Sequence, residues 1–429
     1  MMSTIGAIIG LLLAIFLIIK RIPIAYSMMV GAITGGLLGG LSLVGSVSVM
    51  IDGVKDITPA IIRILTAGVL SGVLIKTGAA ESISNTIVRK LGERYVYMAL
   101  ALSALLLCAI GVFIDVTIIT VAPIALQIHK KCGIPIARLL IVMVGGGKCG
   151  NIISPNPNTI IAVENFNAEL YSTMYANLIP ALIGFTFTVF VVAKIFPGEK
   201  GHTTGTSQLM IIDTFETDKN LPSFSTSITG PIVTIILLAL RPLCGVTVDP
   251  LIALPTGGLV GIICMRRISV FRESMEYGLS KMASVAILLV GTGTIAGIIK
   301  ASSMKDVIID LLSSSPLSEV FIAPVSGILM SAATASSTAG ATIASSSFAP
   351  TILATGVTAV WGAAMVNSGA TVLDHLPHGS FFHATGGSMD VTFKDRLKLI
   401  PYETLIGLVL ALSTVGTYEL SKLLSLYLM

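Results

Sequence analysis

The stretch KCGNIISPNPNTI, from Lys148 to Ile160, holds one lysine, three asparagines and two prolines between two hydrocarbon runs, Leu139–Val144 and Ile160–Val163. Pro155 and Pro157 interrupt a helix, and each lacks a backbone N–H. If the flanking runs lie in lipid, irregular backbone at this depth is tolerated only where protein encloses a polar cavity. The stretch therefore predicts a broken helix at a buried polar site.

The composition of the chain indicates that lipid is its main solvent. Of the 429 residues, 54% are hydrophobic and 11% are charged, and the mean hydropathy is +0.94. A soluble domain carries about 25% charged residues. The net charge of +4 comes without a basic stripe, which argues against nucleic-acid binding. The five cysteines are scattered without disulfide or metal-binding spacing, so no metal and no cofactor are expected.

Apolar runs recur along the chain at lengths near the roughly 20 residues that cross a bilayer. They predict an all-α polytopic membrane protein with about 10 to 14 membrane segments, some of them broken helices or re-entrant hairpins. The candidate spans are Thr4–Ile19, Ile22–Ile51, Ala60–Ile75, Tyr95–Phe113, Val116–Ile128, Ile136–Ile152, Met174–Phe196, Ile228–Leu243, Leu251–Met265, Met282–Ile299, Val320–Ala333, Thr338–Ala354, Thr358–Val372 and Thr404–Leu426.

One polar stretch divides these spans into two halves. Residues 197–229 contain PGEKGHTTGTSQ and DTFETDKN, which are typical of a linker between residues 1–196 and 230–429. Placing Lys20 and Arg21 in the cytoplasm puts most other basic residues outside the spans on the same side, as the positive-inside rule requires. This orientation makes the linker cytoplasmic and places both termini outside.

The two halves carry similar segments in the same order, about 219 to 227 residues apart. The matched pairs are Leu70–Ile83 with Gly293–Val307, Thr117–Leu126 with Thr342–Leu353, and Gly150–Asn158 with Gly369–Gly379. An odd number of predicted segments precedes the linker, so the second half enters the membrane from the opposite side. The pattern predicts two inverted-topology repeats, which are typical of secondary transporters.

Polar islands interrupt the apolar runs in both halves. Gly145–Gly147 are expected to loosen the helix before the Asn-Pro turn, where exposed backbone N–H groups suit an anion and C=O groups suit a cation. The islands Ser331–Ser347 and Asn367–Gly387 supply hydroxyl and amide groups from the second half. Such groups favour a polyhydroxylated or short carboxylate solute. The candidate substrate-binding residues are Asn151, Ser154, Asn156, Asn158, Thr159, Ser336, Ser337, Thr338, Asn367 and Ser368.

Four titratable residues near these islands are candidates for coupling transport to an ion. Asp115 and Asp374 lie at the ends of apolar runs, where desolvation favours the protonated carboxyl that a proton carrier needs. His378 and His383 follow as the next candidates.

Each of these features also has a structural interpretation. Ser331–Ser347 is compatible with close helix packing alone, and Asp115 with a helix cap at the outer interface. Lys148 is long enough to reach the membrane surface. His375, His378 and His383 are also compatible with ordinary positions in a cytoplasmic loop, and the Asn-Pro turn with a purely structural role.

The sequence lacks the motifs of other functional classes. No Gly-rich phosphate loop ends in Lys-Ser or Lys-Thr, which argues against an ATP-driven pump. No local nucleophile motif is present, and Asp115 and Asp374 lack the flanking motifs of a protease dyad. The chain is therefore expected not to be an enzyme, and the repeat favours a carrier over a passive anion channel.

The segment Asn367–Glu403, with LPHGSFFH and KDRLKLIPYE, resembles the gluconate:proton symporter family of bacterial permeases, within the ion transporter superfamily. The resemblance extends more loosely over the whole chain, including Leu70–Gly78 and Gly145–Asn158. It implies a proton-driven, multi-pass inner-membrane carrier of sugar acids or other small hydroxy acids, with 12 to 14 segments by family analogy. The substrate and the lipid bilayer are then its partners, and a homodimer is left open as the assembly.

One departure from the family leaves the substrate open. Members of the family often carry a histidine in the first-half proline turn, whereas this chain has SPNPN at Ser154–Asn158. Gluconate, glycerate and hydroxybutyrate are all candidates. Coupling to sodium, as in a citrate or dicarboxylate carrier, is the alternative to protons, because Asp115 and broken-helix carbonyls suit Na⁺ as well.

Overall fold

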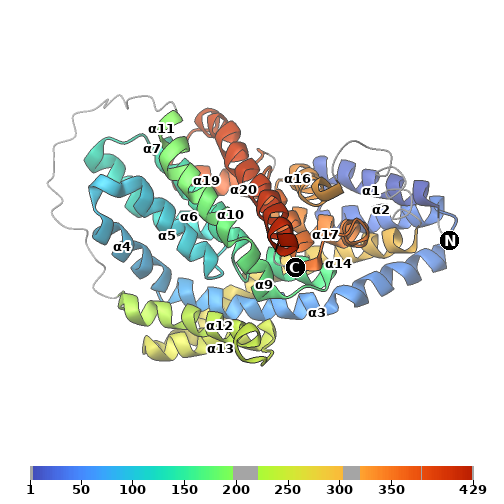
Figure 1. The fold of residues 1–429 in the computed structure, drawn as a ribbon, viewed down its shortest axis with the longest axis horizontal. Helices are drawn as coiled ribbons and strands as arrows, with labels where there is room; N and C mark the ends of the chain where they lie inside the picture. Colours follow the sequence, from blue (N-terminus) through green and yellow to red (C-terminus); the bar gives the residue numbers. More distant parts are fainter. Residues whose placement is uncertain (1–2, 197–220, 303–318, 378, 428–429) are drawn as a thin grey trace.

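The computed structural model describes residues 3–196, 221–302, 319–377 and 379–427. Within these ranges the chain is helical, with no β-strand, which confirms the predicted all-α fold (Figure 1). Five helical runs are both long and apolar enough to cross a bilayer, namely Leu43–Lys76, Ile136–Phe166, Leu170–Ile195, Ile268–Ala301 and Phe393–Leu424. The other apolar helices of the described ranges are shorter.

The helices of the first half are α1 (Thr4–Ile19), α2 (Ile24–Leu38), α3 (Leu43–Lys76), α4 (Ala79–Leu91), η1 (Glu93–Tyr95), α5 (Val96–Ala109), α6 (Ile114–Cys132), α7 (Ile136–Ile152), α8 (Pro157–Phe166), α9 (Leu170–Ala176), α10 (Leu178–Phe187), η2 (Thr188–Val192) and α11 (Ala193–Ile195). In this half, α1 and α2 lie at the N-terminal end of the molecule, α3 runs along its lower side, and α4 to α7 lie at the opposite end (Figure 1).

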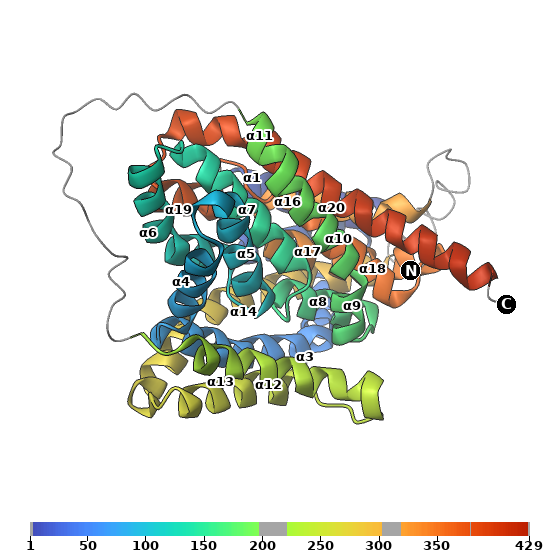
Figure 2. The ribbon, with the colours of Figure 1, turned by 60° about the vertical axis from the view of Figure 1, so that its left-hand side comes forward.

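The second half presents a similar order of elements. Its described helices are α12 (Phe224–Cys244), α13 (Pro250–Cys264), η3 (Ile268–Val270), α14 (Phe271–Ala301), η4 (Glu319–Phe321), α16 (Ile322–Thr334), α17 (Ser337–Ala354), α18 (Ala359–Ala370), α19 (Ser380–Ser388) and α20 (Phe393–Tyr427). In two views, α12 and α13 lie beside α3 (Figures 1 and 2).

The long helices α3 and α14 pack against each other in antiparallel directions and form the base of the molecule. A Cβ atom at Gly53 would lie 2.2 Å from the Gly293 carbonyl oxygen, and one at Gly72 would lie 2.0 Å from the Ser274 carbonyl oxygen. Only glycine allows the two backbones to approach this closely, as in other membrane helix pairs. Helix α2 also packs on α14, and α13 packs on α3.

An ion-pair cluster joins α3 to two other helices. Arg63 of α3 contacts Glu164 of α8, and its guanidinium donates to Asp249, the N-cap of α13, at 2.7 Å. The three side chains are half-buried. Because Arg63 contacts both partners, the cluster links α3 to the broken helix that contains α8 and to the start of α13.

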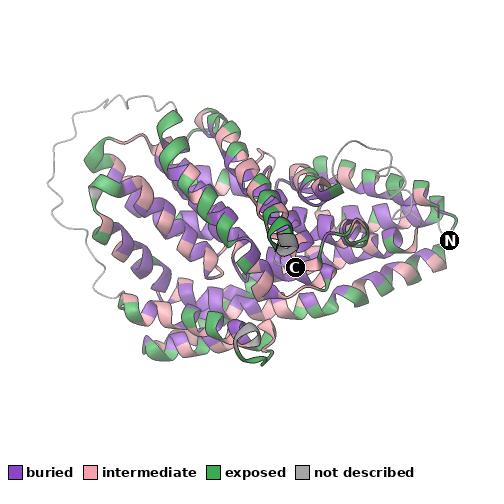
Figure 3. Cartoon of the chain, in the orientation of Figure 1, coloured by how far each residue is buried: buried purple, intermediate pink, exposed green. Residues whose placement is uncertain are grey.

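Side-chain burial agrees with a membrane location. Large apolar side chains such as Leu12, Phe16 and Leu412 are more than half exposed, whereas many alanines and glycines are buried. Exposed and buried positions alternate along the outer helices (Figure 3). This distribution suits a protein whose outer surface faces hydrocarbon, because packing between membrane helices relies on small residues.

Two predicted spans and one boundary were wrong. Ile22–Ile51 and Ala60–Ile75 are not separate spans, because the chain turns at Gly39–Leu41 and α3 then continues through Pro59. Gly40 has φ +93°, which glycine adopts without strain. The predicted linker 197–229 lies mostly outside the described residues, and its end from Phe224 already belongs to α12.

The inverted repeat stays a prediction. A two-fold relation between the halves would produce an antiparallel α3–α14 pair, as observed. It would also place α2 of the first half on α14 of the second, and α13 of the second half on α3 of the first, and both contacts are present. The described residues include only part of the matched segment Gly293–Val307. The orientation in the membrane likewise stays a prediction.

We expect Gly53→Ala to separate α3 from α14, because its methyl group would meet the backbone of Gly293 and Gly297. Overpacking of this kind typically costs about 1–3 kcal/mol. Thermal unfolding in detergent micelles measures the effect. Gly416→Ala on α20 is the matched control, since no atom lies within 4 Å of its Cβ position. Equal melting temperatures for the two variants would contradict the close packing.

Candidate functional site

The first half of the site is the break between α7 and α8, at Ile153–Asn156. Asn156 is the N-cap of α8, and its Oδ1 accepts from the Thr159 N–H at 3.1 Å. Its Nδ2 donates to the Asn151 carbonyl oxygen at 2.9 Å and to Asn151 Oδ1 at 2.6 Å. Pro157 takes the first helical position, where its missing N–H leaves no gap in the hydrogen bonding. The turn is therefore fixed by its own side chains.

The position of this break differs from the expectation in one respect. Gly145–Gly147 do not loosen the helix but lie within the continuous α7. A Cβ at Gly146 would lie 2.0 Å from the Ala101 carbonyl oxygen. Gly146 lets α7 pack closely on α5, whereas Gly145 faces Thr188 and Gly147 faces Ile114. The prolines that follow end the helix.

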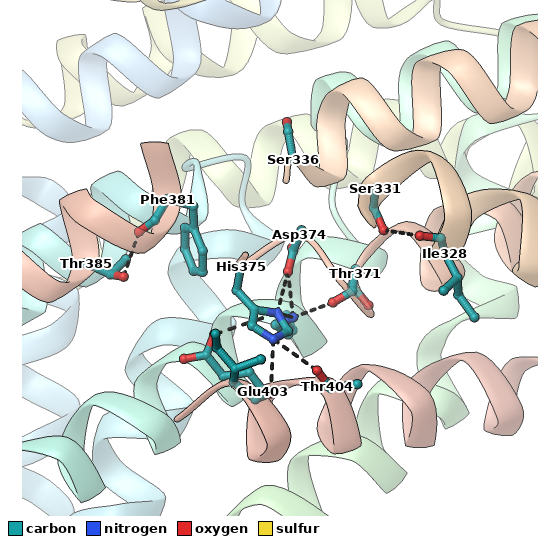
Figure 4. A network of polar contacts seen from close by, with 12 residues as sticks. Ile328, Ser331, Ser336, Thr371, Asp374, His375, Phe381, Thr385, Glu403 and Thr404 are labelled. Carbon is teal, nitrogen blue, oxygen red and sulfur yellow. Dashed lines mark hydrogen bonds and ion pairs between the residues drawn. The ribbon is translucent and has the colours of Figure 1, made fainter. Parts of the chain in front are cut away.

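The second half of the site is the break between α18 and α19, at Thr371–Gly379. Thr371, Asp374 and His375 all lie in this break (Figure 4). Two helical hairpins, α5–α6 and α16–α17, complete the surroundings. Their tips include Gly111 at φ +101° and Ala335 at φ +46°, so each hairpin turns through the left-handed region.

A cavity of about 370 Å³ lies where these elements meet. Its polar lining residues are Asp115, Asn151, Ser284, Ser336, Ser337, Thr338, Asp374 and Ser380. Its apolar lining comes mainly from α2 and α14, for example Ile24 and Leu288. Both predicted halves of the chain therefore contribute to one cavity.

The helix ends around the cavity favour negative charge. The first residues of α6, α17 and α19 all line it, and helix N-termini carry free N–H groups and a partial positive charge. Asp115 is in the first turn of α6, and Ser336 is the N-cap of α17. Three helix N-termini at one cavity form a site suited to an anion.

A buried ion pair lies directly behind the cavity. The Lys148 ammonium is fully buried and donates to Asp374 Oδ1 at 2.6 Å, to His375 Nδ1 at 3.0 Å and to the Thr371 carbonyl oxygen. These three acceptors satisfy its three N–H groups. The possibility that Lys148 reaches the membrane surface is therefore wrong. Lys148 of α7 instead ties the first broken helix to the second.

The polar network continues from His375 into α20. His375 Nε2 lies 3.1 Å from the Ile400 carbonyl oxygen, and its Nδ1 lies 3.7 Å from Glu403 Oε2 (Figure 4). Glu403 forms a two-contact ion pair with Arg396, and both side chains are fully buried. His375 is buried as well, so its interpretation as a loop residue is wrong.

Four residues of this network were not predicted as site residues: Lys148, His375, Arg396 and Glu403. Charged residues inside apolar segments are costly and are usually paired or functional. Lys148 lies in KCGNIISPNPNTI, and Arg396 and Glu403 lie in KDRLKLIPYE. Their common signal was charge within a hydrophobic region, but their partners could not be identified from local sequence.

The structure places the candidate residues in three groups. Asp115, Asn151, Ser336, Ser337, Thr338 and Asp374 line the cavity. Ser154, Asn156, Asn158, Thr159, Asn367 and Ser368 are buried beside it but do not line it. His383 is exposed on α19, and its Nε2–H donates to the Pro377 carbonyl oxygen at 2.8 Å. His378 lies outside the described residues.

Three residues of the second group, Asn158, Thr159 and Asn367, form a polar seam between the halves. Asn158 accepts from Thr338 at 2.6 Å, and Asn165 donates to Ser345 at 2.8 Å, seven residues further along both α8 and α17. Asn367 donates to Thr159 at 3.0 Å. In this conformation these side chains hold α8 against α17 and α18.

An apolar helical chain whose broken helices and hairpins meet at a cavity lined partly by polar groups has the architecture expected of a multi-pass membrane transporter. The model of the GntP family permeases matches residues 2–421, so the chain belongs to this family. Its members are permeases, which confirms the family resemblance and the prediction of a transporter rather than an enzyme.

Individual proteins show the same relationship. An uncharacterised transporter of Haemophilus influenzae is 51% identical, over 98% of this chain and 99% of that protein. A high-affinity gluconate transporter of Escherichia coli is 24% identical, over 94% and 96% of the two chains. The crystal structure of the YdaH transporter of Alcanivorax borkumensis matches 96% of this chain and 97% of its own, with a TM-score of 0.60 at 14% identity.

We expect Asn156→Ala to destabilise the protein, because it removes the cap of α8 and the bonds to Asn151. Loss of an N-cap costs about 1 kcal/mol, and a buried unpaired acceptor adds about 1–3 kcal/mol. Melting temperature in detergent measures this loss. Ser154→Ala is the control, since the Ser154 hydroxyl has no partner among the described residues. An Asn156→Ala protein with normal melting but weakened substrate binding would return Asn156 to the role of a ligand.

Proposed function

We propose that this permease imports a small hydroxycarboxylate by proton symport across the bacterial inner membrane. The observation that carries the proposal is the cavity where three helix N-termini meet two carboxylates. Gluconate, glycerate and hydroxybutyrate are the candidate substrates. The gluconate transporter among the relatives supports this substrate class.

The cavity suits the shape and chemistry of such acids. Ligand pockets span about 300–1,000 Å³, and 370 Å³ is at the small end of that range. The helix N-termini offer N–H groups to a carboxylate. The hydroxyls of Ser336, Ser337 and Ser284 and the amide of Asn151 can pair with substrate hydroxyl groups.

Charge balance at the cavity supports protons as the coupling ion. Of the described lining residues, only Asp115 and Asp374 are charged. Lys148 compensates Asp374, whereas Asp115 has no ion-pair partner among the described residues. A substrate anion would enter beside the uncompensated Asp115 carboxylate, and a proton on Asp115 removes that repulsion. Solute and proton then cross together.

The remaining parts of the proposal follow from the sequence. The segment between α11 and α12 is cytoplasmic, two inverted repeats provide alternating access, and the protein assembles in lipid as a monomer or a homodimer. His378 and His383 stay secondary candidates for coupling, although His383 does not line the cavity. Sodium coupling and passive anion conduction are the competing functions.

We expect proteoliposomes to accumulate one or more labelled acids when the outside is acidic, and not when a sodium gradient is imposed alone. The panel contains D-gluconate, glycerate, 3-hydroxybutyrate and citrate. A protonophore should abolish accumulation, since it removes the driving gradient. Accumulation driven only by sodium would select the sodium-coupled alternative, and equilibration without accumulation would select a channel.

We expect Asp115→Asn to accumulate less substrate than wild type under a proton gradient but to keep exchange of labelled for unlabelled substrate. The amide cannot take up and release a proton, although it leaves the cavity neutral for the anion. Uptake and counterflow in the same vesicles measure the two activities. The exposed variant Asp395→Asn serves as the matched control, because Asp395 pairs with Lys398 on the surface. Normal accumulation by Asp115→Asn would assign Asp115 a structural role.

A further inference from the structure

Lys148 is a cation placed one side chain away from the cavity. It does not line the cavity and is fully buried. Asp374 lines the cavity with its few exposed atoms and binds the Lys148 ammonium at 2.6 Å on its inner side. Figure 4 shows Asp374 between the network around His375 and the region of Ser336. A titratable carboxylate therefore lies between this buried charge and the cavity.

We propose that Lys148 supplies the positive charge that binds the substrate's carboxylate, and that Asp374 controls its availability by taking up a proton. The inference rests on the proposed function and assigns roles within the same site. While the cavity is empty, the Asp374 carboxylate neutralises Lys148. When a proton from solution binds Asp374, the ammonium charge becomes available to the substrate anion.

The exchange conserves charge at the site. One proton and one carboxylate anion enter, the Lys148 ammonium keeps its three protons, and no covalent bond other than the O–H bond of Asp374 forms or breaks. Binding of the anion and of the proton must then favour each other to the same extent, because linkage between two ligands is reciprocal. A substrate anion without the proton would face two carboxylates, and a proton without the anion would leave a buried ammonium uncompensated.

The other charged groups around Asp374 leave this relation intact. His375 follows it in the chain, with Nδ1 3.3 Å from Asp374 Oδ1. Its Nε2 faces the Ile400 carbonyl oxygen at 3.1 Å, and its Nδ1 lies 3.0 Å from the Lys148 ammonium nitrogen. Glu403 and Arg396 neutralise each other beyond His375. Asp115 of α6 is the remaining charged residue of the cavity lining, so it must be removed from the measurement.

A purely structural role for the pair makes different predictions. Lys148 also donates to the Thr371 carbonyl oxygen at the end of α18. The Lys148–Asp374 pair therefore also holds α7 against the break between α18 and α19. If fastening were its whole role, neutralising one partner would harm folding because a buried charge would lose its partner. Neutralising both partners would then restore folding and substrate binding together.

The experiment measures binding of radiolabelled D-gluconate, or of the panel acid that wild-type protein accumulates, to purified protein between pH 6 and pH 8. In Asp115→Asn protein we expect affinity to fall as pH rises, by up to about tenfold per pH unit, the limit for one linked proton. Adding Asp374→Asn should leave affinity nearly constant over this range, because the amide mimics the protonated carboxyl. Asp395→Asn is the control carboxylate, on an exposed ion pair.

A second variant separates the proposal from the structural role. Lys148→Gln with Asp374→Asn removes both charges and leaves no buried charge unpaired, so we expect a folded protein that has lost at least tenfold in affinity for the acid. Binding by this double variant with wild-type affinity would overturn the proposal. An unchanged pH dependence in the Asp115→Asn, Asp374→Asn protein would overturn it as well.

The wild-type arm distinguishes the two levels of inference. If wild-type protein binds and accumulates none of the acids, the proposed function fails. If it accumulates one of them under a proton gradient but the variants behave as the structural role predicts, only the role of Lys148 and Asp374 fails.

Discussion

The ion pair between Lys148 and Asp374 is the interaction on which the two broken helices depend. An isolated ammonium in a protein interior costs several kcal/mol, and the pair is stable only because all three of its N–H groups find acceptors. The acceptors come from Thr371, Asp374 and His375, all in the break between α18 and α19. The last turns of α7 are thus held against the break between α18 and α19. This contact fixes where the cavity lies between the two broken helices.

Close packing of backbones makes this arrangement possible. Glycines let α7 approach α5 and let α3 approach α14 to distances that a methyl group would prevent. Since lipid supplies no hydrophobic force between helices, such contacts and interhelical hydrogen bonds provide much of the association. The seam of Asn158 with Thr338 and Asn165 with Ser345 belongs to the same class of interaction. It joins the halves beside the cavity, whereas α3 and α14 join them at the base.

Local sequence predicted the helices well and their partners poorly. Thr4–Ile19 and Ile136–Ile152 coincide with α1 and α7, because apolar runs ended by charge or proline are local signals. The turn at Gly40 and the passage of α3 through Pro59 were missed, since neighbouring helices can satisfy the backbone around a proline. The Asn-Pro break was found, but the partner of Lys148 lies 226 residues away. A distance of that kind carries no signal in a single sequence, and for the same reason Asn158 was assigned to substrate rather than to Thr338.

The polar residues of this region form two groups: those whose hydrogen bonds are made to other parts of the protein, and those that line the cavity. Asn156 is used by the first turn of α8, and Asn158 and Thr159 are used by side chains of the second half. Among the cavity-lining residues, Asp115, Ser337 and the N-terminus of α19 instead face the space where a solute would lie. A broken helix needs polar side chains for its own backbone before any remain for a ligand. Selection of a solute therefore depends on the polar groups that the protein does not bind itself. Here these groups are hydroxyls, helix N-termini and carboxylates. Together they favour an anion that carries hydroxyl groups and is accompanied by a proton.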